Sequence, residues 1–130
     1  MAIRVAAAII LSESGILIAQ RAKGQQQEGF WEFPGGKVEP GETEEACLRR
    51  EILEELGYEI EVTRFFAENV HAYAEKRILL RAFFCRLKGG EMNLTVHDEA
   101  AWVDRSALRD FEFAPADVPI VEKLMLAPLP

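Results

Sequence analysis

The sequence predicts an α+β fold, more narrowly an α/β/α sandwich in which a mixed β-sheet lies between helices. Two observations predict this class: strand patterns occur in both halves of the chain, and a helix pattern follows each group of strands. The chain has 130 residues, of which 49% are hydrophobic and 28% are charged. This size is typical of one domain with its own core, so we expect a single domain over residues 1–130.

The N-terminal region predicts a β-hairpin. Apolar residues fill 5–11 and 16–19, and a polar, glycine-containing turn at 12–15 separates them. Because the two runs are continuous rather than alternating, we expect both strands to be covered on both faces. The first run is far shorter than the roughly 20 residues of a membrane span, and it lacks the pattern of a secretory signal.

A helix is predicted in the middle of the chain, after a polar loop at 23–29 and a short β-prone segment at 30–33. The helix covers 44–56, with Thr43 as its N-cap and Gly57 as the residue that ends it. Its expected apolar side consists of Ala46, Leu48, Ile52, Leu53 and Leu56.

The second half predicts mostly strands. Alternating apolar and polar residues indicate a half-buried strand over 58–63, and β-prone runs cover 78–87 and 100–103. A brief helical turn is expected at 106–110, and a final helix at 119–127. The residues of this last helix that we expect to face inward are Ile120, Val121, Leu124 and Met125.

Charge and cysteine content exclude several classes of protein. The net charge is −7, whereas a protein that coats DNA or RNA needs a basic surface, so we expect no nucleic acid polymer as a partner. No membrane partner is expected either. Cys47 and Cys85 form no CxxC motif, which argues against a zinc site and against a disulfide framework. A reduced, cytoplasmic location is the expectation that follows.

Three carboxylates share one face of the helix predicted over 44–56. Glu51, Glu54 and Glu55 stand at positions i, i+3 and i+4. The alternative interpretation is a solvated charged face, which normally carries lysine or arginine at i+4 to relieve the repulsion. No such residue follows these glutamates, and only Arg50, four positions before Glu54, supplies a positive charge. An uncompensated group of carboxylate oxygens is what Mg²⁺ selects.

The spacing around this helix matches the pattern G-x5-E-x7-R-E-U-x-E-E-x-G-U, in which U is a bulky aliphatic residue. The seven invariant positions are occupied by Gly36, Glu42, Arg50, Glu51, Glu54, Glu55 and Gly57. The chain therefore resembles the Nudix hydrolases. The hairpin, Arg21 and the segments 31–39 and 114–119 resemble the MutT branch in particular, with its (d)CTP pyrophosphohydrolases and 8-oxo-dGTP diphosphatases.

The resemblance implies the Nudix fold, hydrolysis of a nucleoside diphosphate linked to another group, and a requirement for Mg²⁺, for which Mn²⁺ can substitute. The metal ligands it implies are Gly36 (through its carbonyl), Glu51, Glu54 and Glu55. The implied catalytic residues within the motif are Glu54, Glu51 (a ligand or the base) and Arg50. Arg50 is expected to orient a carboxylate, and Glu42 to act as a supporting residue or an outer ligand.

Two positions depart from the family pattern. Tyr58 replaces the last aliphatic residue of the motif, which is a mild change. Relatives often carry a glutamate six residues before the strand tryptophan, where this chain has Val96. His97, Asp98 and Glu99 follow directly, and Glu99 is our candidate for the missing ligand or base. The alternative is that this segment is an ordinary acidic loop.

Four residues are candidates for binding the substrate. Arg21 matches a MutT arginine that contacts the substrate phosphate, with a surface ion pair as the alternative. Lys37 is either near the phosphates or solvated. Phe33 is a candidate for stacking on the base, although it and the other aromatics Trp31, Phe83 and Phe84 are also compatible with a place in the core.

Asp117 occupies the place where MutT uses asparagine to read the base edge. A carboxylate accepts hydrogen bonds, so it favours paired donors such as those of guanine, or the exocyclic amine of cytosine. The alternative is that Asp117 caps the last helix ahead of Pro119.

The predicted function is that of a Mg-dependent nucleoside triphosphate pyrophosphohydrolase. It would convert a modified (d)NTP, such as 8-oxo-dGTP or a dCTP derivative, to the (d)NMP and pyrophosphate, and so clean the nucleotide pool. The alternatives are a Nudix hydrolase of ADP-ribose or dinucleotide polyphosphates, and a non-catalytic nucleotide sensor. The chain starts at the hairpin, without the added strands through which ADP-ribose relatives dimerise, and it keeps every carboxylate of the motif, so neither alternative is favoured. We expect a monomer or a weak homodimer.

Overall fold

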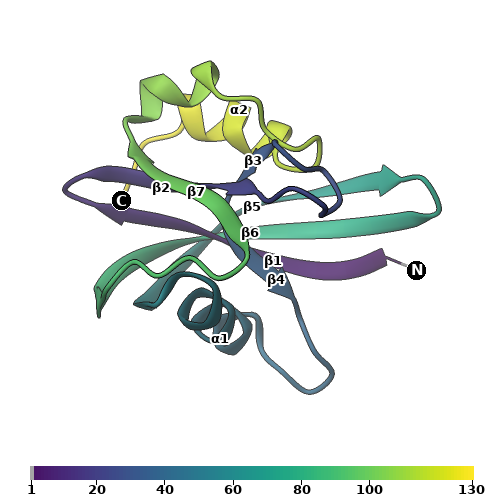
Figure 1. Cartoon of the computed structure of the whole chain (residues 1–130), viewed down its shortest axis with the longest axis horizontal. Coiled ribbons are helices and arrows are strands. Elements are labelled where there is room, and N and C mark those ends of the chain that lie inside the picture. Colours follow the sequence, from purple (N-terminus) through teal and green to yellow (C-terminus); the bar gives the residue numbers. More distant parts are fainter. Residues whose placement is uncertain (1) are drawn as a thin grey trace.

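The computed structural model describes residues 2–130. Its strands are β1 (Ala2–Ser12), β2 (Gly15–Arg21), β3 (Trp31–Glu32), β4 (Gly35–Lys37), β5 (Tyr58–Tyr73), β6 (Lys76–Gly90) and β7 (His97–Val103). They form one sheet in the order β3-β2-β1-β6-β5, with β4 paired to β1 and β7 paired to β2. Helix α1 (Glu44–Leu56) covers one face, while α2 (Val118–Leu126) and the short 3₁₀ helix η1 (Arg105–Asp110) cover the other (Figure 1). The predicted sandwich is confirmed.

The sheet is mixed because its two central strands, β1 and β6, run parallel. Their register extends from Ala2 opposite Arg77 to Leu11 opposite Arg86. The other pairings are antiparallel, and they include the predicted N-terminal hairpin and a long β5–β6 hairpin. Parallel neighbours need a crossover connection, and the chain between β1 and β6 carries α1 and β4 across the sheet.

Strand β1 contributes to two cores at once. Ala6, Ala8 and Ile10 pack beneath α1, whereas the alternating residues Ala7 and Ile9 pack beneath α2. All five are at most 1% exposed. The continuous apolar run therefore serves both faces of the sheet, as predicted, because successive side chains of a strand point to opposite sides.

Helix α1 begins and ends where the sequence predicts. The Thr43 hydroxyl accepts a hydrogen bond from the Ala46 N–H at 3.0 Å, and Gly57 ends the helix at φ 78°. The expectation for Leu53 was wrong, because 54% of this residue is exposed. A helix that packs on a sheet with one face buries only a narrow stripe, here Cys47, Leu48, Ile52 and Leu56, and Leu53 lies beyond the edge of this stripe.

Strand β5 is ten residues longer than the predicted 58–63. The β5–β6 register shifts between Val62 and Arg64 and again between Phe65 and Ala67. Such bulges change which side chains face the core, so the alternating pattern disappears from the sequence although the strand continues. The other predicted elements are confirmed with ends that move by a few residues.

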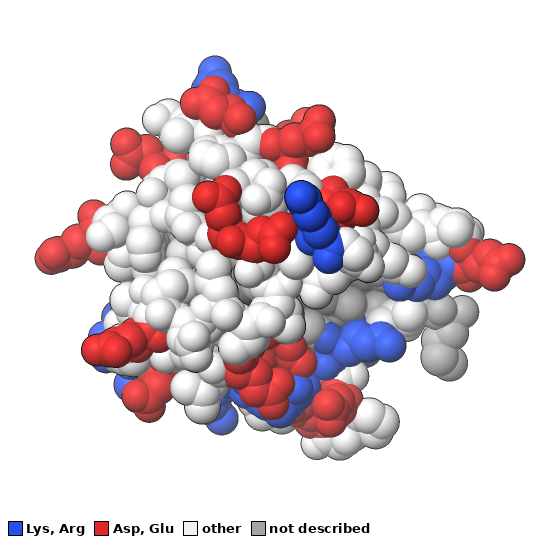
Figure 2. Space-filling view, in the orientation of Figure 1, with Lys and Arg blue, Asp and Glu red and all other residues white. Residues whose placement is uncertain are grey.

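Two further observations concern the whole described chain. Within residues 2–130, no helix is long and apolar enough to cross a membrane. Cys47 and Cys85 are both free and buried. On the face shown in Figure 2, acidic side chains outnumber basic ones, in keeping with the net charge of −7.

Candidate active site

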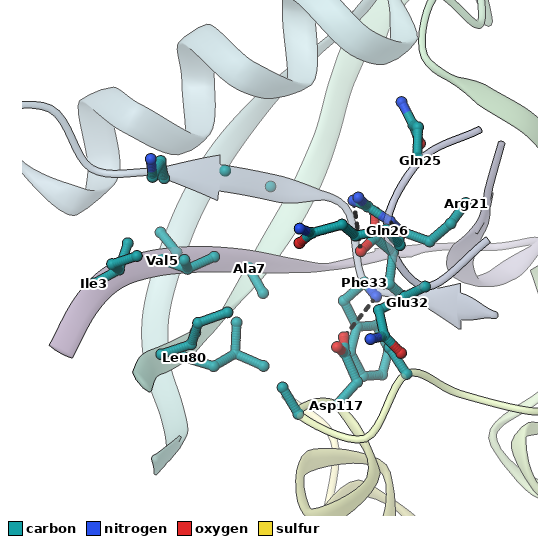
Figure 3. Close-up of a pocket in the computed structure, with 18 of the residues that line it drawn as sticks. Ile3, Val5, Ala7, Arg21, Gln25, Gln26, Glu32, Phe33, Leu80 and Asp117 are labelled. Atoms are coloured by element: carbon teal, nitrogen blue, oxygen red, sulfur yellow. Dashed lines mark hydrogen bonds and ion pairs between the residues drawn. The ribbon is translucent and has the colours of Figure 1, made fainter. Parts of the chain in front are cut away.

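A cavity of about 460 Å³ lies where the sheet meets the C-terminal half of α1 and the turn before α2. Figure 3 shows the apolar side chains of Ile3, Val5 and Leu80 on one side of it, and the polar ones of Arg21 and Glu32 on the opposite side. Gly36, Lys37 and Glu55 line it toward α1, whereas Phe33, Ala116 and Asp117 line it toward α2. The cavity thus joins an acidic wall to a largely apolar pocket.

The acidic wall depends on a close approach between α1 and β4. The Glu51 carboxyl group lies so near Gly36 that a Cβ at position 36 would be 2.4 Å from the Glu51 Cδ. Only 16% of the Glu51 side chain is exposed. Because glycine has no side chain, the Glu51 carboxylate can pack directly against the backbone of β4 at position 36.

Arg50 holds two of the motif carboxylates. Its Nη1 donates to Glu51 Oε1 at 2.7 Å, while Nε and Nη2 donate to the two oxygens of Glu42 at 2.8 and 2.9 Å. These charge-assisted bonds lower the pKa of Glu42 to about 2. Arg50 thus orients Glu51 from the neighbouring position of the same helix, and it does not line the cavity.

The other two motif glutamates differ in their surroundings. Glu55 lines the cavity, and burial together with the Glu51 carboxylate raises its pKa to about 9. Glu54 is 62% exposed in its side chain and lies 3.7 Å from Arg50. Among residues 2–130, no three His, Cys, Asp or Glu side chains converge closely enough to hold a metal ion.

The donor set nevertheless fits a hard divalent cation. Glu51, Glu54 and Glu55 offer carboxylate oxygens on one side of α1, and Gly36 lies directly against the Glu51 carboxyl group. Oxygen donors of this kind suit Mg²⁺ and Mn²⁺.

The last turn of α1 is tied to the segment that leads into β7. The Thr95 hydroxyl donates to the Glu54 carbonyl at 3.0 Å, and the Thr95 N–H donates to the Glu55 carbonyl at 3.2 Å. This connection brings Val96 and His97 into the cavity wall. Glu99 is exposed and pairs with Gln20 in the sheet, outside the residues that line the cavity.

All four candidates for substrate binding line the cavity. Arg21 donates from Nε to the Gln26 carbonyl at 2.9 Å, and its Nη1 lies 3.5 Å from Glu32. Lys37 is exposed. Phe33 is 3% exposed and packs on Phe113 with ring centroids 5.5 Å apart. Trp31, Phe83 and Phe84 belong to the cores on the two faces of the sheet.

Asp117 does not act as a helix cap. It stands at the N-cap position of α2, but its side chain makes no capping hydrogen bond. Its Oδ2 instead accepts a hydrogen bond from the Phe33 N–H at 3.0 Å (Figure 3). The interpretation as an N-cap was therefore wrong, because the side chain turns toward the cavity and the end of β3. Burial raises the pKa of Asp117 well above its usual value.

Sequence reasoning did not name Glu32 and Tyr73 as residues of the cavity, although both line it. Glu32 lies in the predicted β-prone segment and in the segment 31–39 that resembles the MutT branch, and its carboxylate directly before Phe33-Pro34-Gly35-Gly36 was a usable signal. Tyr73 gave no signal, because it ends the bulged part of β5. Its hydroxyl accepts a hydrogen bond from the Ala116 N–H at 2.8 Å, and its ring lines the cavity.

Comparison with known proteins identifies the family. The family model of the NUDIX domain matches residues 1–124. The chain belongs to the NUDIX family. Members of this family are hydrolases that generally use a divalent metal ion.

Individual NUDIX proteins resemble the chain over nearly its whole length. The CTP pyrophosphohydrolase of Escherichia coli is 37% identical over 123 residues, which are 95% of this chain and 91% of that protein. The 8-oxo-dGTP diphosphatase of Haemophilus influenzae is 36% identical over 124 residues, which are 95% of this chain and 91% of that protein.

Solved structures show the same fold. The solution structure of the E. coli ORF135 protein superposes with a TM-score of 0.78 at 37% identity, and the match covers 95% of this chain and 88% of that one. The crystal structure of a MutT NUDIX hydrolase from Burkholderia pseudomallei gives a TM-score of 0.84 at 25% identity, with 95% and 98% covered.

Proposed function

We propose that this NUDIX protein is a nucleoside triphosphate pyrophosphohydrolase that converts a (d)NTP to the (d)NMP and pyrophosphate. The observation that carries the proposal is a single cavity whose acidic wall contains Glu55 and Gly36 and whose other end contains Phe33 and Asp117. Its volume of about 460 Å³ lies within the range of roughly 300–1,000 Å³ that is usual for small-ligand sites. The names of the relatives from E. coli and H. influenzae support the same class of substrate.

The proposed metal ligands are Glu51, Glu54, Glu55 and the carbonyl of Gly36, with Mg²⁺ as the ion and Mn²⁺ as a substitute. Bound there, a divalent cation neutralises phosphate charge and lowers the pKa of water. Arg50 keeps Glu51 in place through its hydrogen bond to Oε1. Glu51 or Glu54 would take the proton of the attacking water. Glu99 is a further candidate for this role, but its exposed position outside the cavity lining makes it less suitable.

The proposed substrate contacts follow the length of the cavity. Arg21 and Lys37 would bind the phosphates, because they are cations beside the acidic wall. Phe33 would contact the base, and the buried Asp117 would read its edge. Modified bases such as those of 8-oxo-dGTP or dCTP derivatives are the proposed targets, which places the enzyme in cytoplasmic nucleotide-pool sanitation, as a monomer or weak homodimer.

A hydrolysis panel tests this function. Purified protein is incubated with Mg²⁺ and 8-oxo-dGTP, dGTP, dCTP, 5-methyl-dCTP, dATP or ADP-ribose, and the products are resolved as nucleotide, pyrophosphate and phosphate. We expect monophosphate and pyrophosphate from at least one triphosphate. Turnover of ADP-ribose alone would replace the proposed substrate class, and binding of nucleotides without turnover would indicate a sensor.

A further inference from the structure

Glu32 and His97 form a buried hydrogen bond in the cavity wall. The His97 Nε2 lies 2.9 Å from Glu32 Oε2, and only 2% of the His97 side chain is exposed. An ionised carboxylate only accepts hydrogen bonds, so Nε2 carries the proton in this pair. Glu32 therefore keeps a proton on Nε2 and fixes the orientation of the His97 ring.

The other ring nitrogen of His97 is buried without a partner. Nδ1 has no hydrogen bond to any group of residues 2–130. Buried polar atoms are nearly always paired, and this one belongs to a residue that lines the cavity.

Glu32 also contacts Arg21 from the opposite side. Both Glu32 oxygens lie 3.5 Å from Arg21 Nη1, while Arg21 Nε is held by the Gln26 carbonyl at 2.9 Å. The guanidinium is thus anchored at two of its three nitrogens. Within residues 2–130, its Nη2 makes no hydrogen bond, so this amino group is free for a ligand.

We propose that His97 is a positioning residue: it fixes Glu32, and Glu32 in turn orients the guanidinium of Arg21 for the substrate phosphate. The inference rests on the proposed function only where it names phosphate as the ligand of Arg21. A purely structural contact between Glu32 and His97 would contribute to folding stability but would leave the order of Arg21 unchanged.

Two substitutions at position 97 separate these roles. The glutamine amide reaches the place of Nε2 and keeps a donor for Glu32, whereas the shorter asparagine amide reaches only the place of Nδ1. The readout is the Nε–Hε NMR signal of Arg21 in the protein without nucleotide, assigned by its absence from Arg21→Lys. We expect His97→Asn to shift or broaden this signal and His97→Gln to retain it.

The control is Glu61→Gln, which removes a carboxylate from an exposed pair with Arg86 (2.9 Å) that lies outside the cavity. It should change the Arg86 signal and leave that of Arg21 unchanged. An unaltered Arg21 signal in folded His97→Asn would overturn the proposal, as would equal changes in His97→Asn and His97→Gln. If His97→Asn does not fold, Glu32→Gln is read in its place with the same expectation for Arg21.

Kinetics give the second readout. Because a charge-assisted hydrogen bond is involved, we expect His97→Asn to raise the KM for a nucleoside triphosphate roughly tenfold with a smaller change in kcat. In an Arg21→Gln background, the same substitution should cause almost no further increase in KM. A full additional tenfold effect there would contradict the proposal. If the wild-type protein hydrolyses no nucleotide, the proposed function fails, while the NMR comparison still decides whether His97 positions Arg21.

Discussion

The carboxyl group of Glu51 occupies the space that a side chain at position 36 would fill. A Cβ on Gly36 would lie 2.4 Å from the Glu51 Cδ and 2.5 Å from its Oε2, distances far inside van der Waals contact. This glycine does not have a positive φ. Glycine is therefore required at position 36 by the neighbouring Glu51 side chain and not by the backbone conformation. This contact explains why the first glycine of the motif occurs together with this glutamate.

Gly36→Ala is expected to displace the Glu51 carboxylate and to lower kcat/KM by at least about tenfold, the smaller end of what a misplaced ligand costs. Gly89→Ala is the matched control, because the nearest atom to its new Cβ would be a carboxylate oxygen of Glu59 at 3.7 Å. Activity and thermal melting of both variants check this. Equal activity in the two variants would show that the position of Glu51 does not matter for turnover.

Glu54→Gln should lose most of its turnover and remain folded. Removing a metal ligand is expected to reduce activity by more than the roughly 10- to 100-fold loss that follows removal of a residue hydrogen-bonded to a ligand. The variant should still fold, because the substitution relieves charge repulsion on α1. Glu45→Gln is the control, because Glu45 lies on the same helix in an exposed pair with Arg49. Steady-state kinetics over a Mg²⁺ titration measure the effect, and full activity of Glu54→Gln would refute the metal assignment.

Arg50→Met should destabilise the fold in a pH-dependent way. Arg50 lowers the pKa of Glu42 to about 2, from an ordinary value near 4.5. The stabilisation by this pair is complete above the unfolded-state pKa and is lost as the pH falls toward 2. The difference in Tm between wild type and variant should therefore be largest near pH 6 and shrink below about pH 4.5. A constant difference would mean that Glu42 does not titrate against Arg50.

Asp117→Asn should show the opposite dependence. Burial raises the pKa of Asp117 well above 3.8. The folded protein therefore becomes less stable as the pH rises above the unfolded-state pKa, because the buried carboxyl group must then ionise or keep its proton at a cost in free energy. Asparagine keeps an oxygen for the Phe33 N–H and cannot ionise. We expect its Tm advantage over wild type to grow with pH, and the preferred base in the hydrolysis panel to change. An unchanged base preference would remove Asp117 as the reader of the base.

Val96→Glu should strengthen metal binding. Val96 is 38% exposed, lines the cavity, and follows Thr95, which is bonded to the Glu55 carbonyl. An added carboxylate there is expected to lower the Mg²⁺ concentration for half-maximal activity by about tenfold, since ligand charge sets the affinity of hard cations. Met92→Glu, equally exposed at 38% and outside the cavity lining, should have no such effect. A similar response of both variants would indicate only a general electrostatic attraction.

Local signals in the sequence predicted α1 and its acidic face. The cap at Thr43, the end at Gly57 and the buried stripe of α1 each depend on residues a few positions away, so the local pattern was sufficient. The same local logic failed for Leu53, because the width of the buried stripe depends on the surface that the helix meets. It also failed for the second half of β5, where bulges interrupt the alternation of Phe65 and its neighbours.

The amino-acid sequence alone determined the family motif, the two-faced hairpin strand and the carboxylates of α1, because each depends on spacing along one element. Only the tertiary structure decided which distant groups meet. It brought Glu51 against Gly36, turned Asp117 toward Phe33 rather than the helix, and placed His97 beside Glu32 while leaving Glu99 exposed. These pairs are separated by up to 84 positions in the chain. Their contacts follow from sheet register and from the docking of residues 93–97 on α1, which no local pattern encodes.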